Sequence, residues 1–437
     1  MRDEEERAPD QRRGRRLRLL RRFTRGQRAV AAVAVAAFLV SLVYSFYYVP
    51  RLRYAFTRVP VIHRTGAAGA RAGVSAVRLD SLVELVVDGV RRGAFPGGAL
   101  AIGQRAQTLL EVGIGRTTWS RLGEPVDPEE TLYDLASLTK VLGTTTAVMA
   151  LVEDGRLHLD DRVVEWLPEF TGGGRDSVTV RQLLTHTSGL PAGHDLHGST
   201  PRERLQYLIS HVDLIARPGE QVLYSDIGFI ILAEVAKRAA GEDLPDFLRR
   251  RVWGPLGMDS TRYEPGAGCD ECAPTLTVDS AGITNDPTAR ELGRVVGNAS
   301  LFSTGHDVGR FVAMLANGGI LDGVRIFRPE TIREFTRPQP GAGTRGLGFE
   351  VFCREGTVPD ALGCLHPFAY GHTGYTGTSF WVGPLRGIWV VLLTNRTFHP
   401  RAPNHLLLLR RLLFLVATAD AYRPPELWND TLLVNAE

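Results

Sequence analysis

Segments with the pattern of β-strands lie near both ends of the chain, whereas helical periodicity fills its middle. Residues 98–116 have the pattern of two short strands around a polar turn, and residues 346–352, 378–383 and 387–395 have that of strands separated by Gly-rich turns. Helical spacing of apolar residues dominates from 137 to about 335. This arrangement predicts an α+β domain whose sheet takes strands from both ends of the chain, with a helical region inserted between them.

Two more segments are predicted to be helices outside that inserted region. Residues 79–97 show helical periodicity that ends in a Gly/Pro stop, and residues 405–422 form an apolar helical stretch. The chain of 437 residues contains 44% hydrophobic and 23% charged residues. This composition is typical of a globular protein with one large or two smaller domains, and it excludes a disordered chain.

The N-terminal end carries an arginine-rich arm followed by an uncharged run. Eleven arginines lie in the first 28 residues, and residues 29–49 contain no charge over 21 positions. Such a run can cross a hydrocarbon core of roughly 30 Å as a helix. A buried core helix and a cleaved signal peptide are the alternatives. Because the run ends in aromatic and then basic residues rather than in a small-x-small cleavage site, an uncleaved transmembrane helix is predicted.

The arm also predicts orientation and location. Its positive charge exceeds that of the three arginines just behind the run, which favours a cytoplasmic N-terminus and an extracytoplasmic location, in the periplasm or at the cell exterior, for the chain after residue 50. The net charge of +3 is concentrated in this arm, so it does not point to nucleic acid as a partner. The predicted organisation is a basic arm at 1–28, a transmembrane helix at 29–49, a linker at 50–75, a globular domain at 76–422 and a tail at 423–437.

Four cysteines fit an oxidising exterior. Cys269 and Cys272 are three residues apart, and Cys353 and Cys364 lie farther along the chain. We expect a disulfide within each local couple. A four-cysteine zinc site is the competing interpretation, but the second couple lacks the tight spacing of such sites. One sequence does not decide the connectivity.

A rare lysine marks the first candidate site. Only two lysines occur, Lys140 and Lys237, although Lys and Arg together number 51. Lys140 follows Ser137 by three residues in a predicted helix that Gly155 closes, so both side chains are expected on one face. A helix N-terminus favours negative charge on the serine oxygen, and an amine can accept its proton where an arginine cannot. A capping serine beside a solvated lysine is the structural alternative.

Two later motifs make the functional interpretation specific. Tyr224, Ser225 and Asp226 precede a predicted helix, and His372-Thr373-Gly374 lies at the start of a strand. With Ser-x-x-Lys, Tyr-Ser-Asp and His-Thr-Gly in this order, the sequence resembles the serine β-lactamase and penicillin-binding-protein superfamily, in particular its class C-like serine hydrolases and esterases. Residues 183–191 and 285–304 are also similar to stretches of that group.

The resemblance covers roughly residues 78 to 420 and implies a fold and a set of roles. The implied fold is a serine β-lactamase-like one, with an antiparallel sheet flanked by N- and C-terminal helices. Ser137 would be the nucleophile, Lys140 would hold it and help take its proton, and Tyr224 would shuttle a proton to the leaving group. The backbone N–H groups of Ser137 and Tyr375 would form the oxyanion hole. The substrate would be bound by Asp226, His372, Thr373 and Gly374.

Two departures from the family pattern narrow the expected activity. Asp226 stands where the family has asparagine, and an ionised carboxylate there would pair with Lys140 and favour the charged amine, which gives Tyr224 more weight as the base. His372 stands where many members have a lysine for the substrate carboxylate, and a neutral histidine should bind β-lactams less well.

The sequence therefore predicts a membrane-anchored serine hydrolase that acts through an acyl-enzyme. The substrate would be an ester or a D-amino-acid peptide of peptidoglycan type, with a dedicated β-lactamase less favoured. A catalytically silent domain that binds or senses peptidoglycan or β-lactams is the alternative. No cofactor, metal ion or nucleic acid is expected to take part.

Overall fold

The structure is a computed structural model of the chain, and it divides into two compact units, Met1–Thr57 and Arg58–Glu437. The residues that it describes are 25–48, 59–64, 74–293, 295–351, 369–398 and 406–418. Cys353, Cys364 and the predicted tail at 423–437 lie outside them.

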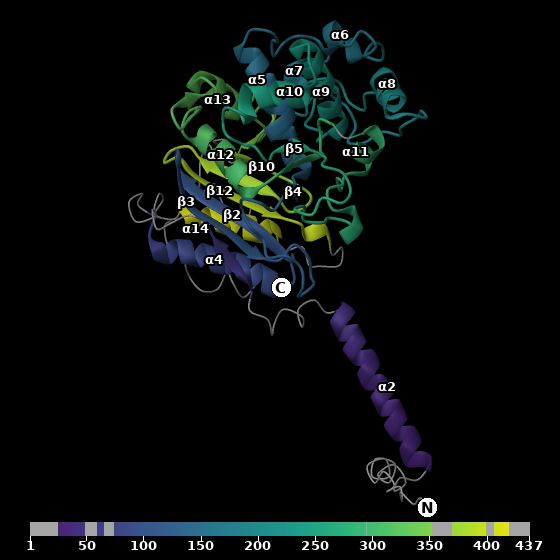
Figure 1. Cartoon of the computed structure of the whole chain (residues 1–437). Helices are drawn as coiled ribbons and strands as arrows, with labels where there is room; N and C mark the ends of the chain where they lie inside the picture. The colour runs from purple at the N-terminus through teal and green to yellow at the C-terminus, as the bar shows by residue number, and fades with distance from the viewer. Residues whose placement is uncertain are drawn as a thin grey trace, which may run out of the picture. The chain divides into compact units, whose positions relative to one another are not determined.

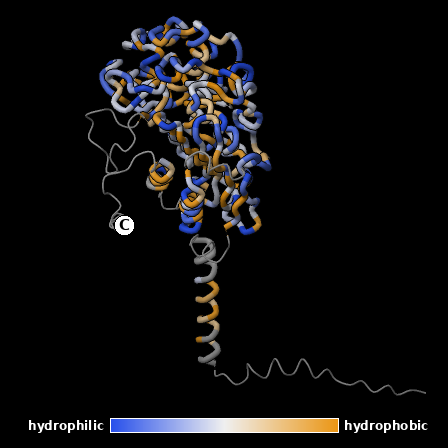
Figure 2. Tube along the Cα trace, turned by 90° about the vertical axis from the view of Figure 1, so that its left-hand side faces the viewer, coloured by the Kyte–Doolittle hydropathy of each residue, from blue (hydrophilic) through white to orange (hydrophobic). Residues whose placement is uncertain are grey.

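The first unit contains one described helix, α2 (Arg25–Tyr48). Its described side chains are predominantly hydrophobic (Figure 2). Within the part of the chain that the structure describes, no helix is both long enough and apolar enough to cross a membrane. The structure therefore does not support the transmembrane prediction for residues 29–49, although it does place a helix there.

In the second unit, seven described strands form one sheet in the order β1-β3-β2-β12-β11-β10-β9, and every neighbouring pair is antiparallel. Their bounds are β1 (Val61–His63), β2 (Gly97–Gln104), β3 (Gln107–Gly115), β9 (Glu350–Val351), β10 (Tyr370–Thr373), β11 (Ser379–Gly383) and β12 (Ile388–Thr394). The pairing of β2 with β12 joins the two ends of the domain, with Leu100 opposite Leu392. The predicted sheet with strands from both ends is confirmed.

Helices cover both faces of this sheet (Figure 1). On one face lie α4 (Ala76–Arg91) and α14 (Leu406–Thr418), which also contact each other, and on the other lies α12 (Gly305–Ala316). Six buried residues at helical spacing place α4 on the sheet, namely Leu79, Leu82, Val83, Val86, Val87 and Val90. Their burial is the main term that stabilises this layer.

The segment between β3 and β9 is mainly helical, as predicted, and forms the part of the unit away from α4 and α14 (Figure 1). Its α-helices are α5 (Thr146–Glu153), α6 (Val163–Trp166), α7 (Val180–Leu184), α8 (Pro201–His211), α9 (Asp226–Ala240), α10 (Leu244–Leu248), α11 (Pro287–Leu292), α12 and α13 (Pro329–Thr336). The short turns of 3-10 or π geometry are η3 (Ala136–Leu138), η4 (Lys140–Thr145), η5 (Arg175–Ser177), η6 (Arg249–Trp253), η7 (Val278–Ser280) and, after β12, η8 (Arg396–Phe398).

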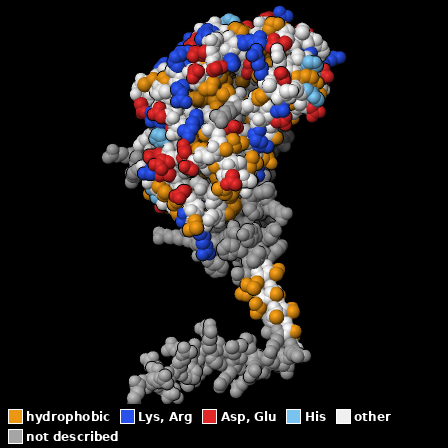
Figure 3. All heavy atoms as spheres, turned by 45° about the vertical axis from the view of Figure 1, so that its right-hand side comes forward, with side chains coloured by type: hydrophobic (Ala, Val, Ile, Leu, Met, Phe, Trp, Pro, Cys, Tyr) orange, Lys and Arg blue, Asp and Glu red, His pale blue; other side chains and the backbone are white. Residues whose placement is uncertain are grey.

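Two small sheets lie within the inserted region. One has the strand order β4-β6-β5, and the other pairs β7 with β8. Their bounds are β4 (Tyr133–Asp134), β5 (Arg262–Tyr263), β6 (Leu301–Ser303), β7 (Ile320–Leu321) and β8 (Val324–Arg325). Charged side chains of both signs are interspersed over the face of this unit that Figure 3 shows.

Two local features bear on the sequence predictions. Strand β1 lies in the segment predicted to be a linker, yet it pairs with β3, so the sheet begins before residue 76. Cys269 and Cys272 form a disulfide, which confirms the first predicted pair. Because both sulfurs are in that bond, neither is available as a thiolate for a four-cysteine zinc site.

Candidate active site

The segment that carries Ser137 turns out of the buried strand β4. The buried carboxylate of Asp134 accepts hydrogen bonds from the backbone N–H groups of Ala136, at 2.9 Å, and Asn285, at 2.6 Å. Ala136 has a φ of 47°, in the left-handed region that non-glycine residues rarely adopt. Burial raises the pKa of the Asp134 carboxyl to about 6. This turn leaves Ser137 partly exposed between buried neighbours.

The predicted helix from Ser137 to Gly155 is not a single regular helix. The structure divides it into η3, then η4 with π-helical geometry, then α5. Within η4 the chain comes close to other segments. A Cβ atom on Gly143 would lie 2.7 Å from the hydroxyl of Tyr263, and the hydroxyl of Thr144 donates to the carbonyl of Gly297 at 2.7 Å. Widened π turns of this kind are frequent at functional sites.

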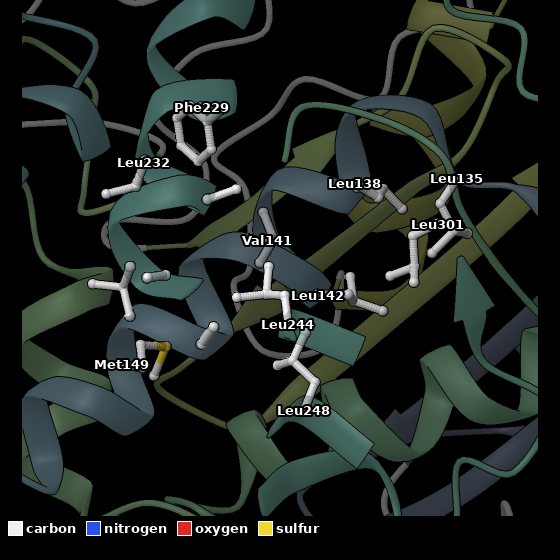
Figure 4. Close-up of a cluster of buried hydrophobic side chains, with 14 of the residues drawn as sticks. Leu135, Leu138, Val141, Leu142, Met149, Phe229, Leu232, Leu244, Leu248 and Leu301 are labelled. Carbon is white, nitrogen blue, oxygen red and sulfur yellow. The ribbon is translucent and has the colours of Figure 1, made fainter. Parts of the chain in front are cut away.

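Hydrophobic side chains of this same segment anchor it in the core (Figure 4). They belong to one buried cluster with residues of α5, α9, α10 and β6, and the labelled members are Leu135, Leu138, Val141, Leu142, Met149, Phe229, Leu232, Leu244, Leu248 and Leu301. Close packing on this side restricts movement of the backbone that positions Ser137 and Lys140.

Lys140 joins the first two motifs. Its side chain is 0% exposed, and its Nζ contacts three oxygens: it donates to Ser137 Oγ at 3.1 Å and to the carbonyl of Asn298 at 3.0 Å, and it lies 2.6 Å from Asp226 Oδ1. An ammonium has three protons to donate, which these acceptors share with the Tyr224 hydroxyl. The predicted pairing of Lys140 with Asp226 is therefore present.

The charge of this lysine is stabilised in spite of its burial. Burial by itself lowers the pKa of the Lys140 ammonium, but the attraction of Tyr224 and Asp226 and the hydrogen bonds to them outweigh it, and the net pKa lies above the ordinary value. Lys140 is thus a cation that donates to Ser137 Oγ. In this state it does not take the serine proton, which leaves that task to another group.

Tyr224 lies beside the lysine, two residues before the start of α9. Its ring centre is 5.0 Å from Lys140 Nζ and 5.4 Å from Arg345 Cζ, so positive charges are placed close to the phenol ring. Its ring centre is also 4.4 Å from that of His186. The next residue, Ser225, caps α9 by accepting from Gly228 N–H at 2.9 Å, which fixes how the chain enters the helix.

His186 and His372 line the inner side of this cluster as neutral imidazoles. Burial is the largest cause that lowers the pKa of His372 to about 3, and the positive charges of Arg345 and Lys140 act in the same direction. Burial and the same two charges hold the pKa of His186 well below its usual range. The ring of His372 lies 6.3 Å from that of Tyr224. Among the described residues its Nε2 has no hydrogen-bond partner.

The third motif reaches the nucleophile through the turn that follows β10. His372 and Thr373 are in β10, with His372 2% exposed and Thr373 partly exposed, and Gly374 is buried. Tyr375 lies in the turn itself, and its side chain is 67% exposed. The structure thus brings the His-Thr-Gly motif beside Tyr224, but it places the His372 side chain inside the domain.

Two threonine hydroxyls tie this turn to the chain that enters Ser137. Thr376 Oγ1 donates to the carbonyl of Asp134 at 2.7 Å, and Thr378 Oγ1 donates to the carbonyl of Leu135 at 2.9 Å. A Cβ atom on Gly374 would lie 2.5 Å from the Leu135 carbonyl oxygen, so only glycine fits there. The turn that carries the N–H of Tyr375 is therefore fixed against the residues just before Ser137.

Several residues of the site lie outside the three sequence motifs. The Asn298 carbonyl and His186 come from the stretches 285–304 and 183–191, which carry the family resemblance but give no role to a particular residue. Arg345 comes from a loop before β9, and Arg410 from α14, where it donates to the carbonyl of Gly374 at 2.8 Å. Two adjacent arginines, Arg410 and Arg411, interrupt the apolar run of α14, and nothing in the sequence distinguishes Arg410 from Arg411.

Comparison with known proteins agrees with this geometry. The Beta-lactamase family model matches residues 82–413. A protein of Escherichia coli strain K12 named "Putative D-alanyl-D-alanine carboxypeptidase" is 29% identical over 307 residues, covering 62% of this chain and 70% of that protein. One of the same name from Escherichia coli O157:H7 is 27% identical over 390 residues, covering 79% and 88%.

Solved structures share the fold. EstCE1, described as a hydrolase with promiscuous acyltransferase activity, superposes with a TM-score of 0.64 at 24% identity, covering 77% of this chain and 98% of that one. A penicillin-binding protein homologue from Caulobacter crescentus gives a TM-score of 0.60 at 23% identity, covering 78% and 94%. The match over 82–413 spans the domain that holds Ser137, Lys140 and Tyr224, and the chain therefore belongs to the Beta-lactamase family and is a serine hydrolase.

Proposed function

We propose that this serine hydrolase acts through an acyl-enzyme on Ser137 and that its substrate is a D-amino-acid peptide of peptidoglycan type. The observation that carries the proposal is the position of Lys140 Nζ, which contacts both Ser137 Oγ and Asp226. A fixed cation beside the serine oxygen stabilises negative charge on that oxygen as it attacks, in a buried site where such interactions are strong.

In this proposal Tyr224 moves the proton and Lys140 keeps its own. The oxygen of Ser137 bonds to the substrate carbonyl carbon, and its proton passes to the oxygen of Tyr224, which acts in this step as the phenolate. The N–H groups of Ser137 and Tyr375 hold the carbonyl oxygen as it becomes negative. Tyr224 then gives the proton to the departing amine or alcohol. Water attacks the acyl-enzyme by the reverse route and restores Ser137.

The choice of a peptide with a free carboxylate is supported by Arg345. His372 is neutral, so it cannot take the role of a lysine that binds a substrate carboxylate. The side chain of Arg345 is 17% exposed, and its charge reaches Tyr224 and both buried histidines. A guanidinium suits a planar carboxylate because it can donate two parallel hydrogen bonds. The relatives named as D-alanyl-D-alanine carboxypeptidases agree with this substrate class.

Ester hydrolysis is the second candidate activity. The neutral His372 favours substrates without a carboxylate near that position, and EstCE1, with which this chain shares its fold, is described as a hydrolase with acyltransferase activity. Thr373, Gly374 and Asp226 would contact either substrate. A dedicated β-lactamase is the less favoured outcome.

A substrate panel tests these alternatives on the full-length protein. Rates are measured with D-alanyl-D-alanine peptides, with p-nitrophenyl esters and with nitrocefin, and the Ser137→Ala variant is measured alongside. We expect release of D-alanine with the highest kcat/KM, and labelling of Ser137 by a fluorescent phosphonate. Ester turnover without D-alanine release would favour the second candidate. Absence of labelling would contradict the acyl-enzyme.

We also propose that the hydrolase domain works outside the cytoplasm and that the uncharged segment 29–49 anchors it to the membrane. The Cys269–Cys272 disulfide supports an oxidising compartment, and peptidoglycan-type substrates are extracytoplasmic. Alkaline phosphatase fused after residue 64 should be active, and washing membranes with high salt should not release the full chain. Activity of only a cytoplasmic reporter at that junction would contradict the orientation.

A further inference from the structure

The turn after β10 contains the peptide group that joins Gly374 to Tyr375. Its N–H belongs to Tyr375, which the proposed function places in the oxyanion hole, and its C=O belongs to Gly374. That carbonyl accepts a hydrogen bond from Arg410 Nη2 at 2.8 Å. The donor for the substrate and the acceptor of a cation are thus the two ends of the same amide.

Arg410 also closes the turn. The same Nη2 donates to the carbonyl of Thr378 at 2.6 Å, while Gly374 N–H donates to that carbonyl at 2.7 Å. Gly377 N–H donates to the Gly374 carbonyl at 3.1 Å. The guanidinium therefore joins the two ends of a short turn, and the Thr376 and Thr378 hydroxyls join the turn to the chain that enters Ser137.

A cation bound to a peptide carbonyl polarises the whole amide. Electron density moves toward the oxygen, and the N–H at the other end becomes a stronger donor, as in cooperative chains of hydrogen bonds. The strength of an oxyanion donor matters most in the transition state, when the substrate oxygen carries charge. We propose that Arg410 is a positioning residue that both fixes the turn and strengthens the Tyr375 N–H through the Gly374–Tyr375 peptide group.

The guanidinium remains charged where it needs to act. Burial lowers its pKa to about 10, and the nearby charge of Arg396 acts in the same direction, while Glu350 opposes them. Below pH 9 the group is therefore still a cation. A residue that only fixed the turn would need hydrogen bonds but no charge. Charge is therefore the property that separates fixing the turn from strengthening the Tyr375 N–H. This inference rests on the proposed acyl-transfer function.

Three substitutions separate position from polarisation. Arg410→Met removes the hydrogen bonds and the charge, Arg410→Gln keeps a neutral donor, and Arg410→Lys keeps a cationic donor. With the substrate that the wild type hydrolyses best, we expect kcat to fall by about 10-fold or more in the Met variant, because loss of a whole oxyanion donor costs about 10² to 10³. The Gln variant should be intermediate, the Lys variant should stay near the wild type, and KM should change little in all three.

A spectroscopic measurement reads the oxyanion contact directly. In the acyl-enzyme, the infrared stretch of the ester carbonyl moves to lower frequency as its hydrogen bonds strengthen. We expect a shift to higher frequency in the order Lys, Gln, Met. The control is Arg91→Met on the neighbouring helix α4, where the side chain is 54% exposed and pairs only loosely with Glu84 at 3.5 Å. It should leave kcat and the carbonyl frequency unchanged.

Equal kcat and frequency in the Gln and Lys variants would overturn the electrostatic role, and a loss confined to KM or to the melting temperature would overturn both roles. If the Met variant does not fold, the comparison of the Gln and Lys variants still tests the electrostatic role of Arg410. Failure of the proposed function looks different, because Ser137→Ala would then retain activity and the wild type would form no acyl-enzyme.

Discussion

Lys140 and Asp226 form an ion pair of unequal exposure. Their Nζ and Oδ1 atoms are 2.6 Å apart, and the side chains are 0% and 34% exposed, respectively. The second lysine of the chain, Lys237, makes the same kind of pair with Asp243 at 2.7 Å, but there the side chains are 48% and 66% exposed. The two pairs differ chiefly in burial, so one serves as an internal control for the other.

The first prediction compares the two lysines. Lys140→Arg should lower kcat/KM by at least about 10²-fold, because a planar guanidinium cannot direct one nitrogen at Ser137 Oγ, the Asn298 carbonyl and Asp226 in a closed site. Lys237→Arg should change kcat/KM by less than about 2-fold, because exposed pairs contribute little. Ser137→Ala should abolish hydrolysis and phosphonate labelling while circular dichroism stays unchanged. Full activity of Lys140→Arg would contradict any role for this amine.

The second prediction concerns pH and the Asp226 carboxylate. The pKa of Lys140 in the folded protein is raised, so its ammonium contributes stability that is complete below about pH 10.5 and is lost as the pH rises through the folded-state pKa. Asp226→Asn removes an attraction that raises this pKa and leaves the burial that lowers it. The alkaline limb of kcat/KM should therefore move to lower pH. Asp243→Asn should leave the pH–rate profile unchanged, and an unmoved limb in Asp226→Asn would show that the proton on Lys140 is not needed.

The sheet could be predicted from the sequence where strands are long enough to show a pattern. Apolar runs and turn residues predict β2, β3, β11 and β12, and all four are present. The strand predicted at 346–352 is reduced to the two residues of β9, and β1, with only three residues, is too short for a periodicity to stand out from chance. These strands form because a neighbour offers hydrogen bonds, which is a property of the fold and not of the segment.

The site divides in the same way. Ser137, Lys140 and Tyr224 lie in short motifs with fixed spacing, so the sequence predicts that they meet. The Asn298 carbonyl, Arg345 and Arg410 reach the site from distant segments, and no local pattern marks them. The π turn after Ser137 depends on contacts with Tyr263 and Gly297, which helix propensity does not encode. The sequence thus predicts the roles of residues within a motif, but it does not predict which distant residues interact with them electrostatically.

The third prediction uses the neutral state of His372. Its pKa is about 3 in the folded protein and ordinarily 6.5, so between these values the unfolded chain binds more protons and stability is lost as the pH falls. In the His372→Gln variant this loss of stability should be smaller. The unfolding free energy of each protein is measured in urea at pH 7 and at pH 4.5, and the decrease between the two pH values is compared. By nuclear magnetic resonance, His372 should stay neutral at pH 5, where His306, whose pKa is raised by its hydrogen bond to Glu111, should be protonated. Equal pH dependence in both proteins would contradict a buried neutral imidazole.

The fourth prediction concerns the disulfide near the nucleophile. Cys272 forms an isolated β-bridge with Leu132, the residue just before β4. In it, Leu132 N–H donates to the Glu271 carbonyl, and Ala273 N–H donates to the Leu132 carbonyl. Because the Cys269–Cys272 loop is short, loss of the bond should cost about 2 kcal/mol in unfolding free energy by the chain-entropy relation. Cys269→Ser should show this in denaturant titrations. Peptide mass mapping without reduction should also find Cys353 linked to Cys364, a pairing that stays a prediction.

The fifth prediction separates the two proposed substrate classes at Arg345. The guanidinium pairs with Glu350 at 3.3 Å and faces the ring of Tyr224. Arg345→Gln should lower kcat/KM for D-alanyl-D-alanine peptides by about 10-fold to 100-fold, the scale of a hydrogen bond to a charged group at roughly 1.5–3 kcal/mol. Most of that change should appear in KM, because the carboxylate is bound equally in the ground state and the transition state.

For p-nitrophenyl esters, which lack the carboxylate, the same variant should change kcat/KM by less than about 3-fold. Arg337→Gln is the matched control, since Arg337, the residue just after α13, is 51% exposed and pairs with Glu334 of that helix. It should affect neither substrate. Amidation of the peptide C-terminus should slow the wild type and leave Arg345→Gln almost unaffected. The amidated peptide lacks the carboxylate that Arg345 binds, so the two enzymes should then hydrolyse it at similar rates. Equal losses on peptide and ester would mean that Arg345 acts on Tyr224 and not on the substrate carboxylate.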